Sequence, residues 1–331
     1  MKTPPLATTW RDPNGEYLPV SLESISTGAL HDVDVFTRVG DQFFIIKPKN
    51  SNFDLELVKK LRDTTPFLYI KTLDREKYFN KFEENIGKVF RNSKIDLKQK
   101  GALLTDWTVE LIDRLYKDPG HPVAMQQAKV AADYYVRYIS DHSQAFLELV
   151  ELRNHDEYTY AHSVGVAAYS IALAIQFGYK DKELSAIGLA GLLHDIGKCM
   201  IDPNIINKKG PLNSAEWNQM KKHPEFGAEI LRRHKGLDPI IALGAESHHE
   251  TPSGTGYPKG VLSSQLDPKI SFISIADTFS ALTTARSYSQ ARDTVSALKL
   301  IKESVPTKFD NNTFKNFVVL FLDEQSQKKI A

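Results

Sequence analysis

A series of histidine and aspartate residues recurs through positions 162–277 at intervals of 25 to 32 residues, and it restricts the fold more than any other feature. Each interval accommodates one helix, a turn and the start of the next helix. Successive helices of a bundle can therefore each direct one or two side chains to a common centre. Helical periodicity from Ala102 almost to the end of the chain agrees with such a bundle. The series comprises His162, His194, Asp195, His223, His248, His249 and Asp277.

The middle of the series lies in an apolar segment, AGLLHDIGKCM at residues 190–200, whose apolar side chains have the spacing of a buried helical stripe. His194 and Asp195 each need a partner there to offset their desolvation. The simplest explanation is a core histidine bonded to a backbone carbonyl, with Asp195 paired to Lys198 three residues on. The other members of the series favour a shared metal site over this explanation.

Seven potential ligands are too many for one ordinary metal ion and suit two ions that share a bridging carboxylate. Asp195 is the natural bridge, because it lies between His194 and the rest of the series. Neutral nitrogens and hard oxygens without a thiolate favour iron, manganese or another first-row metal, with zinc also possible. Cys199 is isolated, and we interpret it as a packing residue.

A chain of 331 residues suggests two domains. Between residues 18 and 82 the segments VDVFTRV and QFFIIK flank Gly40-Asp41 and predict a β-hairpin, PFLYIK predicts another strand, and helices are expected after Asn52 and after Asp74. We therefore predict an α+β protein: a small α+β domain of regulatory type at 1–95, a helical connection at 96–148, and an all-α helical bundle at 149–331.

The overall charge of +1 provides no sustained basic field, so neither a nucleic-acid polymer nor a membrane surface is expected as a partner. A single cysteine fits a reducing compartment, and the first residues lack the layout of a signal peptide. The most apolar stretch, residues 164–177, is shorter than the roughly 20 residues that span a bilayer and predicts a buried helix. These features indicate a cytoplasmic protein.

Five ordered segments resemble the HD-GYP family of the HD phosphohydrolase superfamily. The two parts of the family name are present as His194-Asp195 and Gly256-Tyr257-Pro258. The resemblance covers about residues 150–320. Its segments are HSVGVAAYS, LLHDIGK, KKGPLNSAEWNQMKKHPEFGAEIL, ESHHETPSGTGYPKG and ISIADTFSALTTARSY.

The resemblance implies a mostly helical, metal-dependent phosphodiesterase that hydrolyses the bacterial second messenger cyclic di-GMP to pGpG or GMP, commonly with iron. One metal would be held by His162, His194, Asp195 and Asp277, and the other by Asp195, His223, His248 and His249. Two ions about 3.5 to 4 Å apart can activate a shared water as hydroxide and neutralise phosphoryl oxygens. Asp195 and Lys198 are thus the catalytic candidates.

The resemblance also supplies candidates for substrate binding. Lys198 would contact a phosphate oxygen, and its alternative role is a structural ion pair with Asp195. Gly256, Tyr257 and Pro258 would form a tight loop beside the site, although Tyr257 can equally be an aromatic packed on the bundle. Arg286 matches a family position whose guanidinium binds ligand phosphate.

Four positions depart from the family pattern. Tyr158 stands where members with a third metal carry glutamate, so we predict two ions. Ser253 and Ser280 replace aspartates, and Ser289 replaces a cation. We interpret these serines as a weakened substrate-facing shell around an intact metal core.

The departures leave a second hypothesis open, a weakly active or inactive signalling protein that binds nucleotide or partner proteins. A third is a phosphohydrolase acting on another cyclic dinucleotide or a nucleotide. The N-terminal domain would serve regulation or dimerisation, so signalling proteins and a homodimer are the expected partners besides the nucleotide. The alternative is a purely structural appendage.

Overall fold

The structure is a computed structural model that describes residues 15–62, 64–65, 67–93, 95–141, 145–146, 149, 159–284 and 291–322. The chain divides into two compact units, and the division between Trp107 and Thr108 falls within helix α3 (Leu97–Lys117). Tyr158, Arg286 and Ser289 lie outside the described residues.

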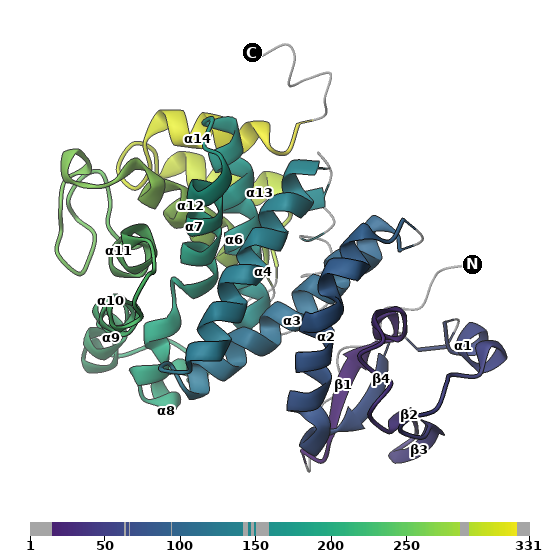
Figure 1. Ribbon diagram of the computed structural model, residues 1–331. Coiled ribbons are helices and arrows are strands. Elements are labelled where there is room, and N and C mark those ends of the chain that lie inside the picture. Colours follow the sequence, from purple (N-terminus) through teal and green to yellow (C-terminus); the bar gives the residue numbers. More distant parts are fainter. Residues whose placement is uncertain are drawn as a thin grey trace. The chain divides into compact units, whose positions relative to one another are not determined.

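The N-terminal unit contains a four-stranded sheet whose strand order is β1-β4-β2-β3, with antiparallel neighbours throughout (Figure 1). The predicted hairpin and the strand PFLYIK are confirmed, with Gly40 at a φ of 62° in the hairpin turn. We did not predict β1, a five-residue edge strand that contains Pro19. The strands are β1 (Tyr17–Ser21), β2 (Val35–Val39), β3 (Gln42–Lys47) and β4 (Phe67–Lys71).

Both helices predicted for this unit are confirmed as α1 (Leu55–Arg62) and α2 (Arg75–Arg91). Two short 3-10 helices are also present: η1 (Leu22–Thr27) follows β1, and η2 (Thr72–Asp74) connects β4 to α2. Helix α2 buries Tyr78 and Phe82, and the Tyr78 hydroxyl lies 2.6 Å from Ser24 Oγ. The α+β fold class is therefore confirmed.

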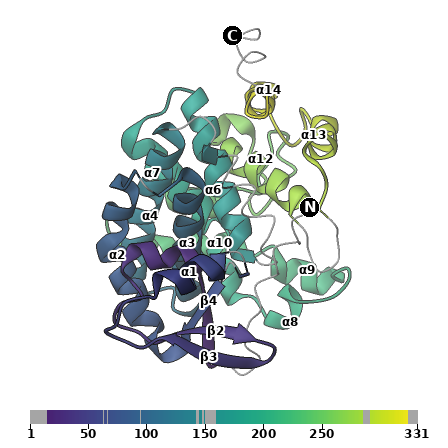
Figure 2. The ribbon, with the colours of Figure 1, turned by 90° about the vertical axis from the view of Figure 1, so that its right-hand side faces the viewer.

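The second unit is helical in its described parts (Figures 1 and 2). Three of its helices begin with an aspartate N-cap followed by proline, at Asp202, Asp238 and Asp267, because the carboxylate accepts an early amide and proline suits the first turn. After α3 the elements are α4 (Pro122–Asp141), α6 (Thr159–Gln176), α7 (Asp181–Leu193), η3 (Ile196–Met200), α8 (Pro203–Ile206), α9 (Ser214–Met220), α10 (His223–Arg233), α11 (Pro239–Ser247), η4 (Ser263–Gln265), α12 (Pro268–Thr283), α13 (Thr294–Glu303) and α14 (Asn311–Val319).

Helix α6 forms the centre of this unit, since all its residues from His162 to Ala174 are buried. It packs against α7 and α12, and α7 in turn packs against α4 and α11. The close approach of α6 and α7 depends on two glycines. A Cβ on Gly191 would lie 2.8 Å from Ala167 Cα, and one on Gly188 would lie 2.7 Å from Ile171 Cδ1. The prediction of a buried helix at 164–177 is confirmed, and none of the described helices has the length and apolar character to cross a membrane.

The first prediction concerns this helix contact. Gly191→Ala should lower the free energy of unfolding by about 1 to 3 kcal/mol, because the new methyl group overlaps the backbone of α6. Urea unfolding measures the difference. Gly120→Ala is the control, since the nearest atom to its Cβ would be 3.5 Å away, and its effect should stay within about 0.5 kcal/mol. Equal stability of both variants would contradict the close packing of α6 on α7.

Candidate metal centre

All seven members of the histidine and aspartate series meet at one centre in the helical unit, although they come from five helices. His162 lies in α6 and Asp277 in α12, and His223 begins α10. His194 and Asp195 directly follow α7, and His248 and His249 directly follow α11. The convergence predicted from the spacing is therefore present.

The chain changes direction at the end of α7, which is how two adjacent side chains reach the same centre. We expected the helical stripe to continue through residues 190–200, and this is wrong, because α7 ends at Leu193 and a 3-10 helix, η3, begins at Ile196. In a continuous helix, neighbours would point about 100° apart. Gly197 permits the close approach of η3 to α10, since a Cβ there would lie 2.0 Å from His223 O.

Asp195 presents its two carboxylate oxygens to different histidines. Its Oδ2 lies 3.3 Å from His194 Nε2 and also pairs with the Lys198 ammonium. Its Oδ1 lies 3.2 Å from His223 Nε2 and 3.8 Å from His248 Nε2. The side chain thus lies between two groups of potential ligands, as expected of a bridging carboxylate.

Asp277 occupies the other side of the centre. Its Oδ1 lies 3.1 Å from His162 Nε2 and 3.8 Å from His194 Nε2, and its Oδ2 lies 4.0 Å from His249 Nδ1. Three sets of residues could each hold a metal ion, because one potential ligand atom from each residue lies within 4.8 Å of the others. The sets are His162, His194 and Asp277; His223, His248 and His249; and His194, Asp195 and His248.

Backbone carbonyls orient several of the imidazole rings. Nδ1 of His194, His223 and His248 lies 2.8, 2.8 and 2.9 Å from the carbonyl oxygen three residues earlier in the chain. Because a carbonyl only accepts, each Nδ1 carries the proton, and a neutral ring then directs an Nε2 lone pair into the centre.

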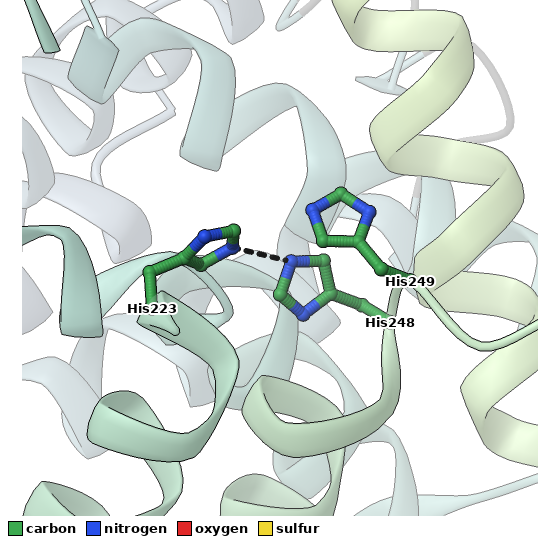
Figure 3. Close-up of side chains that lie close together, drawn as sticks. All are labelled: His223, His248 and His249. Atoms are coloured by element: carbon green, nitrogen blue, oxygen red, sulfur yellow. Dashed lines mark hydrogen bonds between the residues drawn. The ribbon is translucent and has the colours of Figure 1, made fainter. Parts of the chain in front are cut away.

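The lone pairs that result fit a bound cation. Figure 3 shows the rings of His223, His248 and His249 converging, with His223 Nε2 and His248 Nε2 3.3 Å apart. In the described part of the chain, the buried atoms His194 Nε2 and Asp195 Oδ1 have no hydrogen-bond partner of good geometry, although other potential ligand atoms lie within 3.3 Å of each. Buried polar atoms rarely stay unsatisfied, and a divalent ion would satisfy both.

Burial and mutual interaction set the protonation states at the centre. Burial lowers the pKa of His162 and of His249 to about 4, and it lowers the pKa of His248 well below its usual value. For Asp277, burial raises the pKa but the bond from His162 and the charge of His194 outweigh it, so the pKa falls well below its usual range. These three histidines are thus neutral and Asp277 is ionised at neutral pH, the forms that bind metals.

Asp195 and His194 shift each other in opposite directions. Burial raises the pKa of Asp195, but Lys198 and His194 together hold that pKa well below its usual range. Burial lowers the pKa of His194, yet the Asp195 carboxylate raises it overall.

Ser280 does not face the substrate side, so our assignment of this serine to the substrate-facing shell is wrong. It is fully buried, and its Oγ lies 2.8 Å from His162 Nδ1. The hydroxyl therefore orients His162 so that Nε2 faces Asp277. Ser253, by contrast, is exposed and contacts the hydroxyl of Thr255 at 2.8 Å.

The loop that follows α11 packs on the backbone of His249. A Cβ on Gly256 would lie 2.5 Å from His249 O, so glycine permits this close approach. The Tyr257 amide donates to His249 O, and its ring stacks on the His249 ring with centroids 4.6 Å apart and planes 29° apart. Gly256, Tyr257 and Pro258 therefore lie beside the centre, as predicted.

Two buried glutamates hold this loop, and our reading of the sequence did not single them out. Glu250 accepts from the amides of Lys259, Gly260 and Val261 at 2.7 to 3.2 Å. Glu246 accepts from Arg232 and Lys259 at 2.8 and 2.9 Å. A carboxylate directly after the histidine pair, in ESHHE, was the available signal.

Tyr116 of α3 is a further contact that the sequence did not reveal. Its hydroxyl donates to Asp195 O at 2.8 Å and supports the turn after α7. The two residues are 79 positions apart, and no local pattern marks the tyrosine.

Comparison with known proteins agrees with the geometry. The family model described as HD domain matches residues 134–313. A cyclic di-GMP phosphodiesterase of Pseudomonas aeruginosa, PA4108, is 33% identical over 219 residues, which cover 66% of this chain and 53% of the relative. The 3'3'-cGAMP-specific phosphodiesterase 3 of Vibrio cholerae is 35% identical over 188 residues, covering 55% and 40%. The chain thus spans about half or less of these relatives.

A solved structure shares the fold. Bd1817, an HDG"Y"P protein from Bdellovibrio bacteriovorus, superposes with a TM-score of 0.68 and covers 91% of this chain and 98% of its own. The sequence identity is 23%, so this likeness concerns the fold alone.

The second prediction concerns the pH dependence of stability in chelator-treated protein. Because the folded-state pKa of His162 is about 4 and the unfolded value is about 6.5, the unfolded chain binds more protons between these values. The free energy of unfolding should therefore fall as pH falls from about 6.5 to 4, by up to about 1.4 kcal/mol per pH unit for each such histidine. Urea unfolding of wild type and His162→Gln across this range provides the test, and the variant should show the shallower slope. Identical slopes would contradict a neutral, buried His162.

Proposed function

This chain belongs to the HD domain family, and on that premise we propose that it is a metal-dependent phosphodiesterase of the HD-GYP type that hydrolyses cyclic di-GMP to pGpG or GMP. The observation that carries the proposal is the position of Asp195, whose two oxygens face separate histidine groups. The names of relatives support the substrate class, and a V. cholerae relative that is specific for 3'3'-cGAMP makes a mixed cyclic dinucleotide the second candidate.

Two divalent ions, with iron as the proposed metal, would be held in groups that share Asp195. His162, His194 and Asp277 would complete one group, and His223, His248 and His249 the other. Bound there, the ions would supply Lewis acidity toward a phosphodiester and toward the attacking water.

The remaining residues would position the substrate. Lys198 lies against Asp195 Oδ2 with 26% of its side chain exposed, so its ammonium can also reach a phosphate oxygen on the solvent side. The loop of Gly256, Tyr257 and Pro258 would form one wall of the site, held by Glu250. We assign phosphate binding to Arg286 from its sequence position alone.

A weakly active or inactive signalling protein remains the second candidate function. Ser253 favours it, because this exposed hydroxyl provides no charge where the family pattern has an aspartate. We further propose that residues 1–95 regulate or dimerise the protein, that 96–148 connect, and that 149–331 form the hydrolase domain.

The third prediction is the activity itself. Protein reconstituted with iron or manganese under reducing conditions should convert cyclic di-GMP to pGpG or GMP, as followed by chromatography. Asp195→Ala should abolish turnover and lower the metal content, because it removes the carboxylate shared by both groups. Asp133→Ala, an exposed change on α4, is the control and should behave as wild type. Binding of cyclic di-GMP without any product would favour the signalling alternative.

The fourth prediction concerns Ser280. Ser280→Ala should weaken metal binding by about 10- to 100-fold, because His162 loses the partner that orients its ring. Competition with a chromogenic chelator measures this without reference to activity. Ser271→Ala is the control on the same helix, since that hydroxyl donates to Pro268 O instead. Unchanged metal affinity in Ser280→Ala would remove Ser280 from the metal centre.

A further inference from the structure

Helix α9 carries an exposed tryptophan, Trp217, that is not part of the hydrophobic core. None of the seven residues of α9 is buried, and Trp217 is 45% exposed. Polar contacts stabilise the helix instead, through a reciprocal capping box between Asn213 and Glu216 and an ion pair between Lys208 and Glu216. Trp217 is therefore free to serve a surface role.

An aromatic series connects Trp217 to the candidate metal centre. The indole lies 6.0 Å from the Tyr257 ring between centroids, with the planes 75° apart. Tyr257 in turn stacks on His249, which belongs to one of the histidine groups. Trp217 thus lies at the rim of the site, and the ring of Tyr257 connects it to His249.

A purely structural role for Trp217 is not needed to hold this loop. Tyr257 is already fixed by its stacking on His249 and by the bond from its amide to His249 O. Glu250 separately binds three amides of the same loop. These contacts position the tyrosine without help from α9.

We propose that Trp217 is a stacking surface for a nucleobase of the bound nucleotide, an inference that rests on the proposed function. A cyclic dinucleotide with a phosphodiester at the metal centre must place its bases away from that centre, toward the rim. Exposed aromatic side chains bind bases by stacking, which tolerates any base because each has a π-face. Trp217 therefore contributes affinity for guanine and adenine alike and leaves discrimination between them to other groups.

Tryptophan fluorescence of the metal-reconstituted full chain tests the proposal directly. The probes are GMP and ribose 5-phosphate, which has a phosphate but no base. GMP should quench a fluorescence component that is absent from Trp217→Phe, and ribose 5-phosphate should not. If GMP causes no quenching that depends on Trp217, the proposal is overturned.

Affinities separate stacking from a structural effect. Trp217→Ala should weaken GMP binding and raise KM for cyclic di-GMP by about tenfold with kcat nearly unchanged, while Trp217→Phe keeps most of the affinity. Binding of ribose 5-phosphate should be unaffected. The control Val123→Ala, an exposed apolar change on α4, should alter none of these values. Equal weakening of both probes, or of neither, contradicts the proposal.

The outcomes also separate this inference from the proposed function. If wild type hydrolyses no cyclic di-GMP but shows base-dependent quenching at Trp217, the hydrolase proposal fails and the stacking surface stands. If hydrolysis occurs and Trp217→Ala has unchanged KM, the stacking surface fails and the hydrolase stands.

Discussion

The burial of the Asp195 carboxylate is the constraint on which the site depends. Removing an ionised carboxylate from water is costly unless charged or hydrogen-bonding partners surround it. Lys198, His194 and His223 all lie close to its oxygens, and they come from η3, from the end of α7 and from α10. The absence of a side chain at Gly197 lets η3 lie against the backbone of α10. Segments from three parts of the helical unit thus meet at one buried carboxylate.

The loop at the outer part of the site and the residues of the centre are held by different kinds of contact. Imidazole rings and carboxylates of the centre interact with one another, whereas the loop is held by backbone amides that donate to the buried carboxylate of Glu250. This separation explains why substitutions at the rim need not disturb the centre. Ser253 is an exposed rim residue, while Ser280 supports His162 from within the core.

Local patterns predicted most elements because they depend on neighbouring residues. Alternating apolar residues around Gly40 predicted the β2–β3 hairpin, and helical spacing predicted α1, α2 and α6. Strand β1 was not predicted because it has only five residues, one of them Pro19, and because it is defined by pairing with β4 some 50 positions away. The end of α7 was not predicted because the apolar spacing continues past Leu193 to Ile196, and this spacing does not show where the helix stops.

The sequence by itself determined which side chains form the centre, because five histidines and two aspartates at helix-and-turn intervals match a bundle whose successive helices face a common point. Tertiary structure decided what each side chain does there. It placed the Ser280 hydroxyl against His162 Nδ1 and the Glu250 carboxylate against the amides of the loop. It also left Trp217 exposed next to Tyr257. These roles arise from contacts between segments distant in the chain, and spacing along a sequence does not show which distant segment will pack against a given helix face.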